Sequence, residues 1–76
     1  MQRKLIILNA AVHIVREYGN FALSHASVAE FAGIEIETSE ATVRRYFGSW
    51  NDLATSTAAH RGCPKSFRDY VEGLEL

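Results

Sequence analysis

The chain has 76 residues, of which 47% are hydrophobic and 22% are charged, and its formal net charge is -1. This length allows one small domain, and the apolar content excludes a disordered chain, because disordered segments are poor in aliphatic and aromatic residues. The net charge excludes a uniformly basic nucleic-acid-binding surface, so such a function would depend on how charge is distributed.

The cysteine content and the hydropathy pattern indicate the compartment. Cys63 is the only cysteine, so no internal disulfide can form and a reducing environment is expected. No run approaches the roughly 18 apolar residues of a membrane span. The apolar run from Leu5 to Leu8 follows two basic residues, but polar residues interrupt it and no cleavage-type tail follows. We therefore expect a cytoplasmic protein with no membrane contact.

The first predicted element is a helix from about Arg3 to Tyr18. Polar residues mark one side of it, and the other side is apolar with a helical period. The apolar side consists of Ile7, Leu8, Ala11, Val12, Ile14, Val15 and Tyr18. Gly19 is expected to end this helix with a positive φ, and Phe21 and Leu23 are expected to pack the next loop onto the core.

Two short helices are predicted next. Ser24 is a good N-cap for a helix from His25 to Phe31 or Ala32, which Gly33 ends and after which Ile34 enters the core. The segment from Glu35 to Glu40 is a loop or a loop with an early helical turn. Thr38 or Ser39 would cap a third helix, from about Glu40 to Tyr46. The expected inward residues of these helices are Val28, Ala29, Ala32, Ala41, Val43 and Phe47.

The C-terminal third predicts two more helices. Ser49 caps a fourth helix that runs to about His60 or Arg61, with Leu53 and Ala54 inward. Gly62-Cys63-Pro64 breaks the chain, and Ser66 would cap a last helix within residues 64–76. The stripe of Phe67, Tyr70, Val71 and Leu74 on this helix would be core or dimer interface. The fold class expected for residues 1–76 is therefore an all-α, single-domain bundle of four to five short helices.

The most informative pattern is the stretch from Val28 to Ile34 followed by the stretch from Thr42 to Phe47. A short apolar-faced helix, a glycine, a polar turn and a second helix with two adjacent arginines are typical of a helix-turn-helix. Five separated pieces of residues 4–60 resemble, in order, the N-terminal DNA-binding domain of the TetR family of repressors, whose fold is homeodomain-like. These pieces are residues 7–11, 17–19, 24–33, 42–47 and 49–53.

The resemblance implies roles for individual residues. Ser24 matches a hydroxyl residue that contacts a DNA phosphate, and Thr42 matches the threonine of the recognition helix. Arg44 stands where the family usually has a tyrosine, and Tyr46 stands where an aromatic residue or histidine meets the DNA backbone. Phe47 matches a core phenylalanine. The resemblance thus implies binding to double-stranded DNA, in which homodimers read palindromic operators.

The chain also departs from the family pattern. The segment between Gly33 and Thr42 is about four residues longer than the family's turn, and Glu35, Glu37 and Glu40 lie in or beside it. Trp50 replaces a lysine that usually contacts phosphate. Trp50 could instead stack on the DNA backbone or on a partner protein, or staple the third and fourth helices. The 76 residues leave no room for the family's ligand-binding domain.

The candidate DNA-binding residues divide into two groups. Base edges would be approached by Thr42, Arg44 and Arg45, since the arginine fork matches guanine O6 and N7. Because adjacent helical residues point about 100° apart, one of the two arginines would meet phosphate instead. Phosphates would be held by Lys4, Ser24, Ser39 and Tyr46. The alternative for the arginines is a solvated helix surface, and the hypothesis requires them to be free of neighbouring carboxylates.

Catalytic and metal-binding functions have little support in the sequence. His60 and Cys63 have a metal-like spacing, but a zinc site needs about four convergent ligands. Nothing near Cys63 would orient a base for nucleophilic catalysis, and no glycine-rich phosphate loop is present. We therefore expect no enzyme activity, no metal and no cofactor.

Three functional hypotheses follow. The first is a small DNA-binding transcriptional regulator, bacterial or encoded by a phage or plasmid, that acts as a repressor or switch factor. The second is a protein-interaction module that keeps the helix-turn-helix scaffold and binds a host or regulatory protein, with the segment from Glu35 to Glu40 as a docking surface for a basic partner. The third is a fragment of a longer repressor, against which the different tail from Lys65 onward argues.

Overall fold

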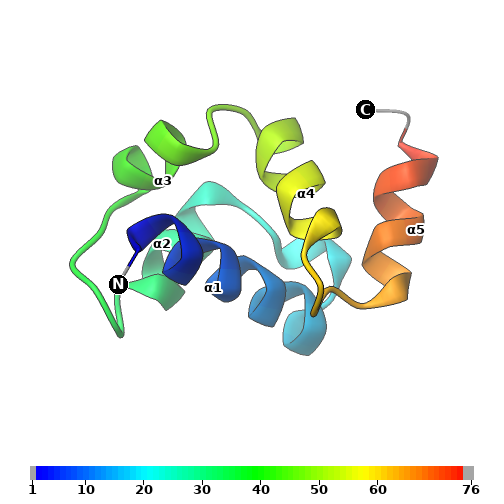
Figure 1. Ribbon diagram of the computed structural model, residues 1–76, viewed down its shortest axis with the longest axis horizontal. Helices are drawn as coiled ribbons and strands as arrows, with labels where there is room; N and C mark the ends of the chain where they lie inside the picture. The colour runs from blue at the N-terminus through cyan, green and yellow to red at the C-terminus, as the bar shows by residue number, and fades with distance from the viewer. Residues whose placement is uncertain (1, 75–76) are drawn as a thin grey trace.

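Five α-helices and one 3-10 turn make up the part of the chain that the computed structural model describes, residues 2–74, and this part contains no strand (Figure 1). The elements are α1 (Arg3–Tyr18), η1 (Asn20–Ala22), α2 (His25–Ala32), α3 (Glu40–Tyr46), α4 (Trp50–Ala59) and α5 (Lys65–Gly73). The expected all-α fold is confirmed, and the bounds of α1, α2 and α3 agree with those predicted.

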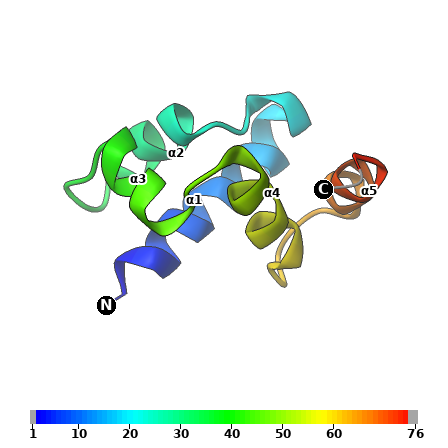
Figure 2. The ribbon, with the colours of Figure 1, turned by 90° about the horizontal axis from the view of Figure 1, so that it is seen from above.

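The helices are arranged around α1, which is the longest of them. It packs against α2 and α4, while α2 also packs against α3 and α4 against α5. In both views α3 and α5 lie at opposite ends of the long axis (Figures 1 and 2). The molecule measures 33 × 22 × 20 Å, so the surfaces of α3 and α5 are well separated.

A single hydrophobic core joins all five helices. Each contributes at least one fully buried side chain, and among these Ile7, Val28, Val43, Leu53 and Phe67 have 0% exposure. Phe67 and Val71 place α5 in the same cluster as the residues of α1 to α4. The C-terminal helix therefore belongs to the fold, and its stripe is partly core, although Leu74 is 40% exposed.

Serine side chains begin three of the helices, as the sequence predicts. The hydroxyl oxygens of Ser24, Ser39 and Ser49 accept hydrogen bonds from backbone N–H groups in the first turns of α2, α3 and α4. Such caps satisfy amide groups that have no intrahelical partner. The predicted cap at Ser66 is wrong. Helix α5 begins two residues earlier, with Pro64 at the N-cap position, because the Pro64 carbonyl already accepts from the amides of Phe67 and Arg68 at 3.1 and 3.2 Å.

Several residues expected in the core are exposed instead. Ile34 is 79% exposed and Phe21 is 89% exposed. Gly33 has a helical φ of -59°, and the chain continues in tight turns in which the Ile36 amide donates to the Ala32 carbonyl at 3.0 Å. Ile36 then packs on the core in place of Ile34. Two further predicted inward residues, Tyr18 and Ala41, also face solvent.

Candidate nucleic-acid interface

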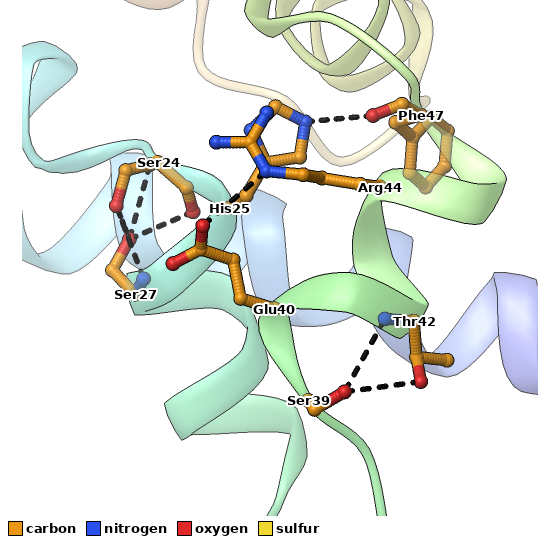
Figure 3. A network of polar contacts seen from close by, with 8 residues as sticks. All are labelled: Ser24, His25, Ser27, Ser39, Glu40, Thr42, Arg44 and Phe47. Atoms are coloured by element: carbon orange, nitrogen blue, oxygen red, sulfur yellow. Dashed lines mark hydrogen bonds and ion pairs between the residues drawn. The ribbon is translucent and has the colours of Figure 1, made fainter.

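A buried histidine fixes the orientation of α3 relative to α2. His25 is 4% exposed, and its Nε2 lies 2.6 Å from the carbonyl oxygen of Phe47, the residue that ends α3 (Figure 3). A carbonyl oxygen only accepts, so the proton is on Nε2 and the ring donates. The N-terminus of α2 therefore lies beside the C-terminus of α3. No pattern of residues indicates this bond, because its acceptor is a backbone atom.

Trp50 serves the fold rather than the exposed surface. It is partly buried, and its indole N–H donates to the Leu23 carbonyl oxygen at 2.9 Å. The interpretation of Trp50 as a partly buried residue that links two segments is therefore confirmed. Its hydrogen-bond partner, however, is Leu23 and not a residue of α3. The indole links α4 to the segment that precedes α2, and its N–H is already used within the chain.

The exposed residues of α3 lie on an outer line and two flanks. Val43 and Phe47 are buried, at 0% and 2% exposure, and define the inward side. With about 100° per residue, Arg45 points almost directly away from that side. Thr42 lies on one flank of this outward direction and Arg44 on the other. Figure 3 shows Thr42 pointing away from the Arg44 side chain.

Arg44 is not free of carboxylates. Its Nε donates to Glu40 Oε2 at 3.3 Å, one helical turn earlier, and the two side chains are 53% and 49% exposed (Figure 3). The hypothesis requires both arginines to be free of neighbouring carboxylates, and Arg44 does not meet this condition. An exposed i,i+4 pair contributes only about 0.3–0.5 kcal/mol. Arg45 is exposed and forms no ion pair within residues 2–74.

The Ser24 hydroxyl is committed to its own helix. Its oxygen accepts from the Ser27 amide at 3.0 Å, and the hydroxyl donates to Ser27 Oγ at 3.0 Å. Ser27 Oγ in turn donates to the Ala22 carbonyl at 2.8 Å. An anion at this end of α2 would therefore meet backbone N–H groups more readily than the hydroxyl.

The first turn of α1 lies beside α3 on the Thr42 flank. Arg3 Nη1 donates to the Glu37 carbonyl at 2.8 Å, and Lys4 Nζ is 5.7 Å from the centre of the Phe47 ring. Ser39 and Thr42 have their hydroxyl oxygens 3.3 Å apart. A shallow hollow of about 370 Å³ is lined by Arg3, Glu37, Thr38, Ser39 and Thr42.

The predicted site residues thus fall into three places. Lys4, Ser39 and Thr42 lie on one flank of α3, and Tyr46, 38% exposed, is on the same side of the helix. Arg44 lies on the other flank and Ser24 at the adjacent end of α2, while Arg45 lies between the flanks. Helix α3 and the two segments before it in the chain also carry exposed glutamates at Glu30, Glu35, Glu37 and Glu40. The surface therefore combines cationic and anionic groups.

The candidate metal pair is occupied by internal hydrogen bonds. His60 Nδ1 accepts from the Gly62 amide at 2.9 Å, and Nε2 lies 3.1 Å from Asn9 Oδ1. Cys63 is buried, and this burial raises the pKa of its thiol despite the nearby Arg68 and Arg16. No group of three or more metal-ligating side chains occurs in the described part of the chain.

Comparison with models of known protein families gives no match, and searches among curated proteins and solved structures give none either. Among residues 2–74, no helix combines the length and the apolar character needed to cross a membrane. The resemblance to TetR repressors therefore stays a prediction.

Proposed function

We propose that the chain is a DNA-binding transcriptional regulator in which α2 and α3 act as a helix-turn-helix. The observation that carries this proposal is the position of Arg45. It projects from α3 opposite the buried Val43, while His25 and the core hold α3 against α2. A rigid short helix with an outward guanidinium group fits the geometry by which such motifs read the major groove.

The flanks of α3 suggest how the remaining residues divide. Arg45 and Thr42 would approach base edges, and Arg44 would turn to phosphate beside the N-terminus of α2. Lys4, Ser39 and Tyr46 would contact the opposite DNA strand's backbone from the first turn of α1 and the near flank of α3. A regulator of this size would act by occupying a promoter as a repressor or switch factor, and a homodimer would suit a palindromic site.

The ion pair between Arg44 and Glu40 is compatible with this proposal on energetic grounds. Breaking an exposed i,i+4 pair costs about 0.3–0.5 kcal/mol. A bidentate arginine contact with guanine supplies roughly 1–3 kcal/mol of discrimination, and charge-assisted contacts with phosphate are also strong. The glutamate lowers affinity without preventing Arg44 from changing partners.

The test is selection of duplexes from a random library, followed by titration at several salt concentrations. Arg45→Ala should reduce discrimination between the selected and a scrambled duplex by about 5- to 150-fold. Arg44→Ala should weaken all duplexes similarly, and Glu40→Ala should strengthen them, because an anion near phosphate is removed. Arg61→Ala, an exposed arginine outside α3, is the matched control and should change little. Absence of binding to any duplex at low salt would refute the proposal.

A second candidate function is a protein-interaction module that uses the same surface. The observation that favours it is the Arg44–Glu40 pair together with the three further exposed glutamates, which reduce the positive field that DNA binding requires. Under this alternative, selection would enrich no duplex, and a partner captured by the chain would be retained after nuclease treatment. Arg45→Ala would then lower affinity for that protein instead of for DNA.

A further inference from the structure

A second surface, formed by α1 and the end of α2, is hollowed and largely apolar. Two hollows of about 350 and 540 Å³ adjoin here, since Phe31 and Ile34 line both of them. Ile6 and His13 line the first, and Tyr18 lines the second. We call this surface the α1–α2 groove and define it by these five residues. No residue of α3 lines either hollow.

The side chains of His13, Phe31 and Tyr18 form one wall of the groove, and their rings contact one another. His13 stacks on Phe31 with ring centres 4.4 Å apart, and its edge meets Tyr18 at 6.5 Å. Ile34 at 79% exposure and Tyr18 at 69% exposure stand beside this stack. A contiguous apolar surface that remains open to water on a small folded chain often marks an interaction site.

The dimensions of the groove suit a short helix. Its residues on α1 run from Ile6 to Tyr18, which at about 1.5 Å per residue spans roughly 18 Å. A helix of about three turns has this length and would present side chains at i, i+4 and i+7 to such a groove.

The charge around the groove identifies the chemistry of the helix that would fit. Glu30 and Glu35 line the two hollows, and both are exposed without an ion pair inside residues 2–74. Arg3 precedes Ile6 by one turn of α1, but its guanidinium is held by the Glu37 carbonyl at 2.8 Å. An occupant with lysine or arginine beside its apolar stripe would complement these carboxylates.

We propose that the α1–α2 groove binds an amphipathic, basic helix of a partner protein. A second copy of this chain fits less well, because a two-fold contact through the groove places the same glutamates on both sides. An anionic lipid surface would be repelled by the same carboxylates. The proposal does not depend on DNA binding, since it uses none of the candidate DNA-binding residues.

The first experiment is selection from a displayed library of 14-residue helical peptides, followed by titration of the best peptide. We expect apolar residues at i, i+4 and i+7 with flanking lysine or arginine. Ile34→Asp should weaken binding at least tenfold, whereas Leu74→Asp, directly after α5 and the matched control, should change it less than twofold. Both replaced side chains are exposed, so circular dichroism should show folded variants.

The second experiment tests the charges. The double variant Glu30→Lys and Glu35→Lys should reverse the preference, so that a glutamate-flanked version of the peptide binds more tightly than the lysine-flanked one. Amide shifts in NMR spectra of the labelled chain should map to Tyr18, Phe31 and Ile34. Enrichment of no peptide, equal binding of a sequence-scrambled peptide, or shifts confined to α3 would overturn the proposal.

Two further measurements separate other outcomes. Dimerisation in sedimentation experiments that Ile34→Asp abolishes would show that a second copy occupies the groove, and this would overturn the proposal. Duplex binding of Ile34→Asp should equal that of the unaltered chain. Loss of peptide binding with retained DNA binding is then distinguishable from failure of the DNA-binding proposal, which Arg45→Ala tests.

Discussion

At the scale of single residues, backbone carbonyl groups hold many of the polar side chains in this molecule. His25 and Trp50 donate to the carbonyls of Phe47 and Leu23. Arg16 and Arg68 donate to two successive carbonyls, those of Gly62 and Cys63, at 2.6 and 2.9 Å. Arg16 lies in α1 and Arg68 in α5, and their hydrogen bonds connect both helices to the turn between α4 and α5. These side chains are therefore used in positioning the helices.

Cys63 allows a prediction at this scale. Burial raises the pKa of its thiol, and the thiolate is the reactive form. Iodoacetamide should therefore modify the native chain more slowly than the urea-unfolded chain at the same pH, because a smaller fraction of the native thiol is ionised. As pH is raised, the modification rate should increase at a higher pH in the native chain than in the unfolded chain. Mass spectrometry can measure both rates.

The same shift has a consequence for stability. The folded chain holds the thiol proton more tightly than the unfolded chain, so this contribution is complete below the unfolded pKa and is lost as pH rises through the folded pKa. Equal modification rates for native and unfolded chains would contradict the argument.

At the scale of elements, the sequence predicted helices well where local chemistry decides them. A hydroxyl before an apolar period is a local signal, and it predicts caps at Ser24, at Ser49 and at either Thr38 or Ser39. Ser24, Ser39 and Ser49 cap their helices. Ile34 was misplaced because the backbone conformation of Gly33, which decides where the next side chain points, is not written in the residue type. The contact of His25 with Phe47 depends on packing between helices and had no signal.

The sequence predicts which helix carries the candidate site residues, but not how their side chains are arranged. The sequence identified α3 and its two arginines, but not which arginine is free. The spacing of Glu40 and Arg44 was a signal that could have shown the pairing, since residues four apart on a helix are neighbours. The separation of the site into two flanks required the inward direction of α3, which Val43 and Phe47 define only once the core is assembled.

Gly19 gives a prediction for the junction between α1 and η1. Its φ of 97° and ψ of 171° lie in a region that is essentially restricted to glycine. Gly19→Ala should therefore destabilise the fold by about 1–3 kcal/mol, measured by urea unfolding, although no atom lies within 4 Å of the added Cβ.

Gly73 provides the matched control for this substitution. It ends α5 with open space around an added Cβ and no positive φ. Gly73→Ala should be neutral or should stabilise the chain by up to about 1 kcal/mol. Similar losses in both variants would mean that crowding or some effect other than backbone strain is responsible.

At the scale of the whole molecule, the core does not stop where the family resemblance stops. The resemblance covers residues 4–60, yet Phe67 at 0% exposure and Val71 at 7% lie in the same core cluster as Ile7 and Leu53. Helix α5 thus completes the burial of the other helices. A chain of this size has little stability to spare, at about 0.05–0.15 kcal/mol per residue.

A shortened chain tests this point. A variant that ends at Gly62 should lose cooperative thermal unfolding, because the surfaces covered by Phe67 and Val71 become exposed. Val71→Ala in the full chain, which removes two buried methyl groups, should cost about 2 kcal/mol while unfolding stays cooperative. A shortened chain that melts at the original temperature would show that α5 contributes nothing to the fold.

The two ends of the molecule also carry its two lysines, Lys4 and Lys65. Lys4 lies against Phe47 at the α3 end, and the Lys65 side chain, at the start of α5, is 86% exposed. Acylation of the two lysine amines by a small reagent therefore tests where DNA binds. Lys4 is the probe and Lys65 is the internal control. A duplex seated on α3 should shield the first amine and leave the second reacting at its usual speed. Protection of Lys65 alone would mean that DNA binds at the α5 end of the molecule, which would contradict the proposed site on α3.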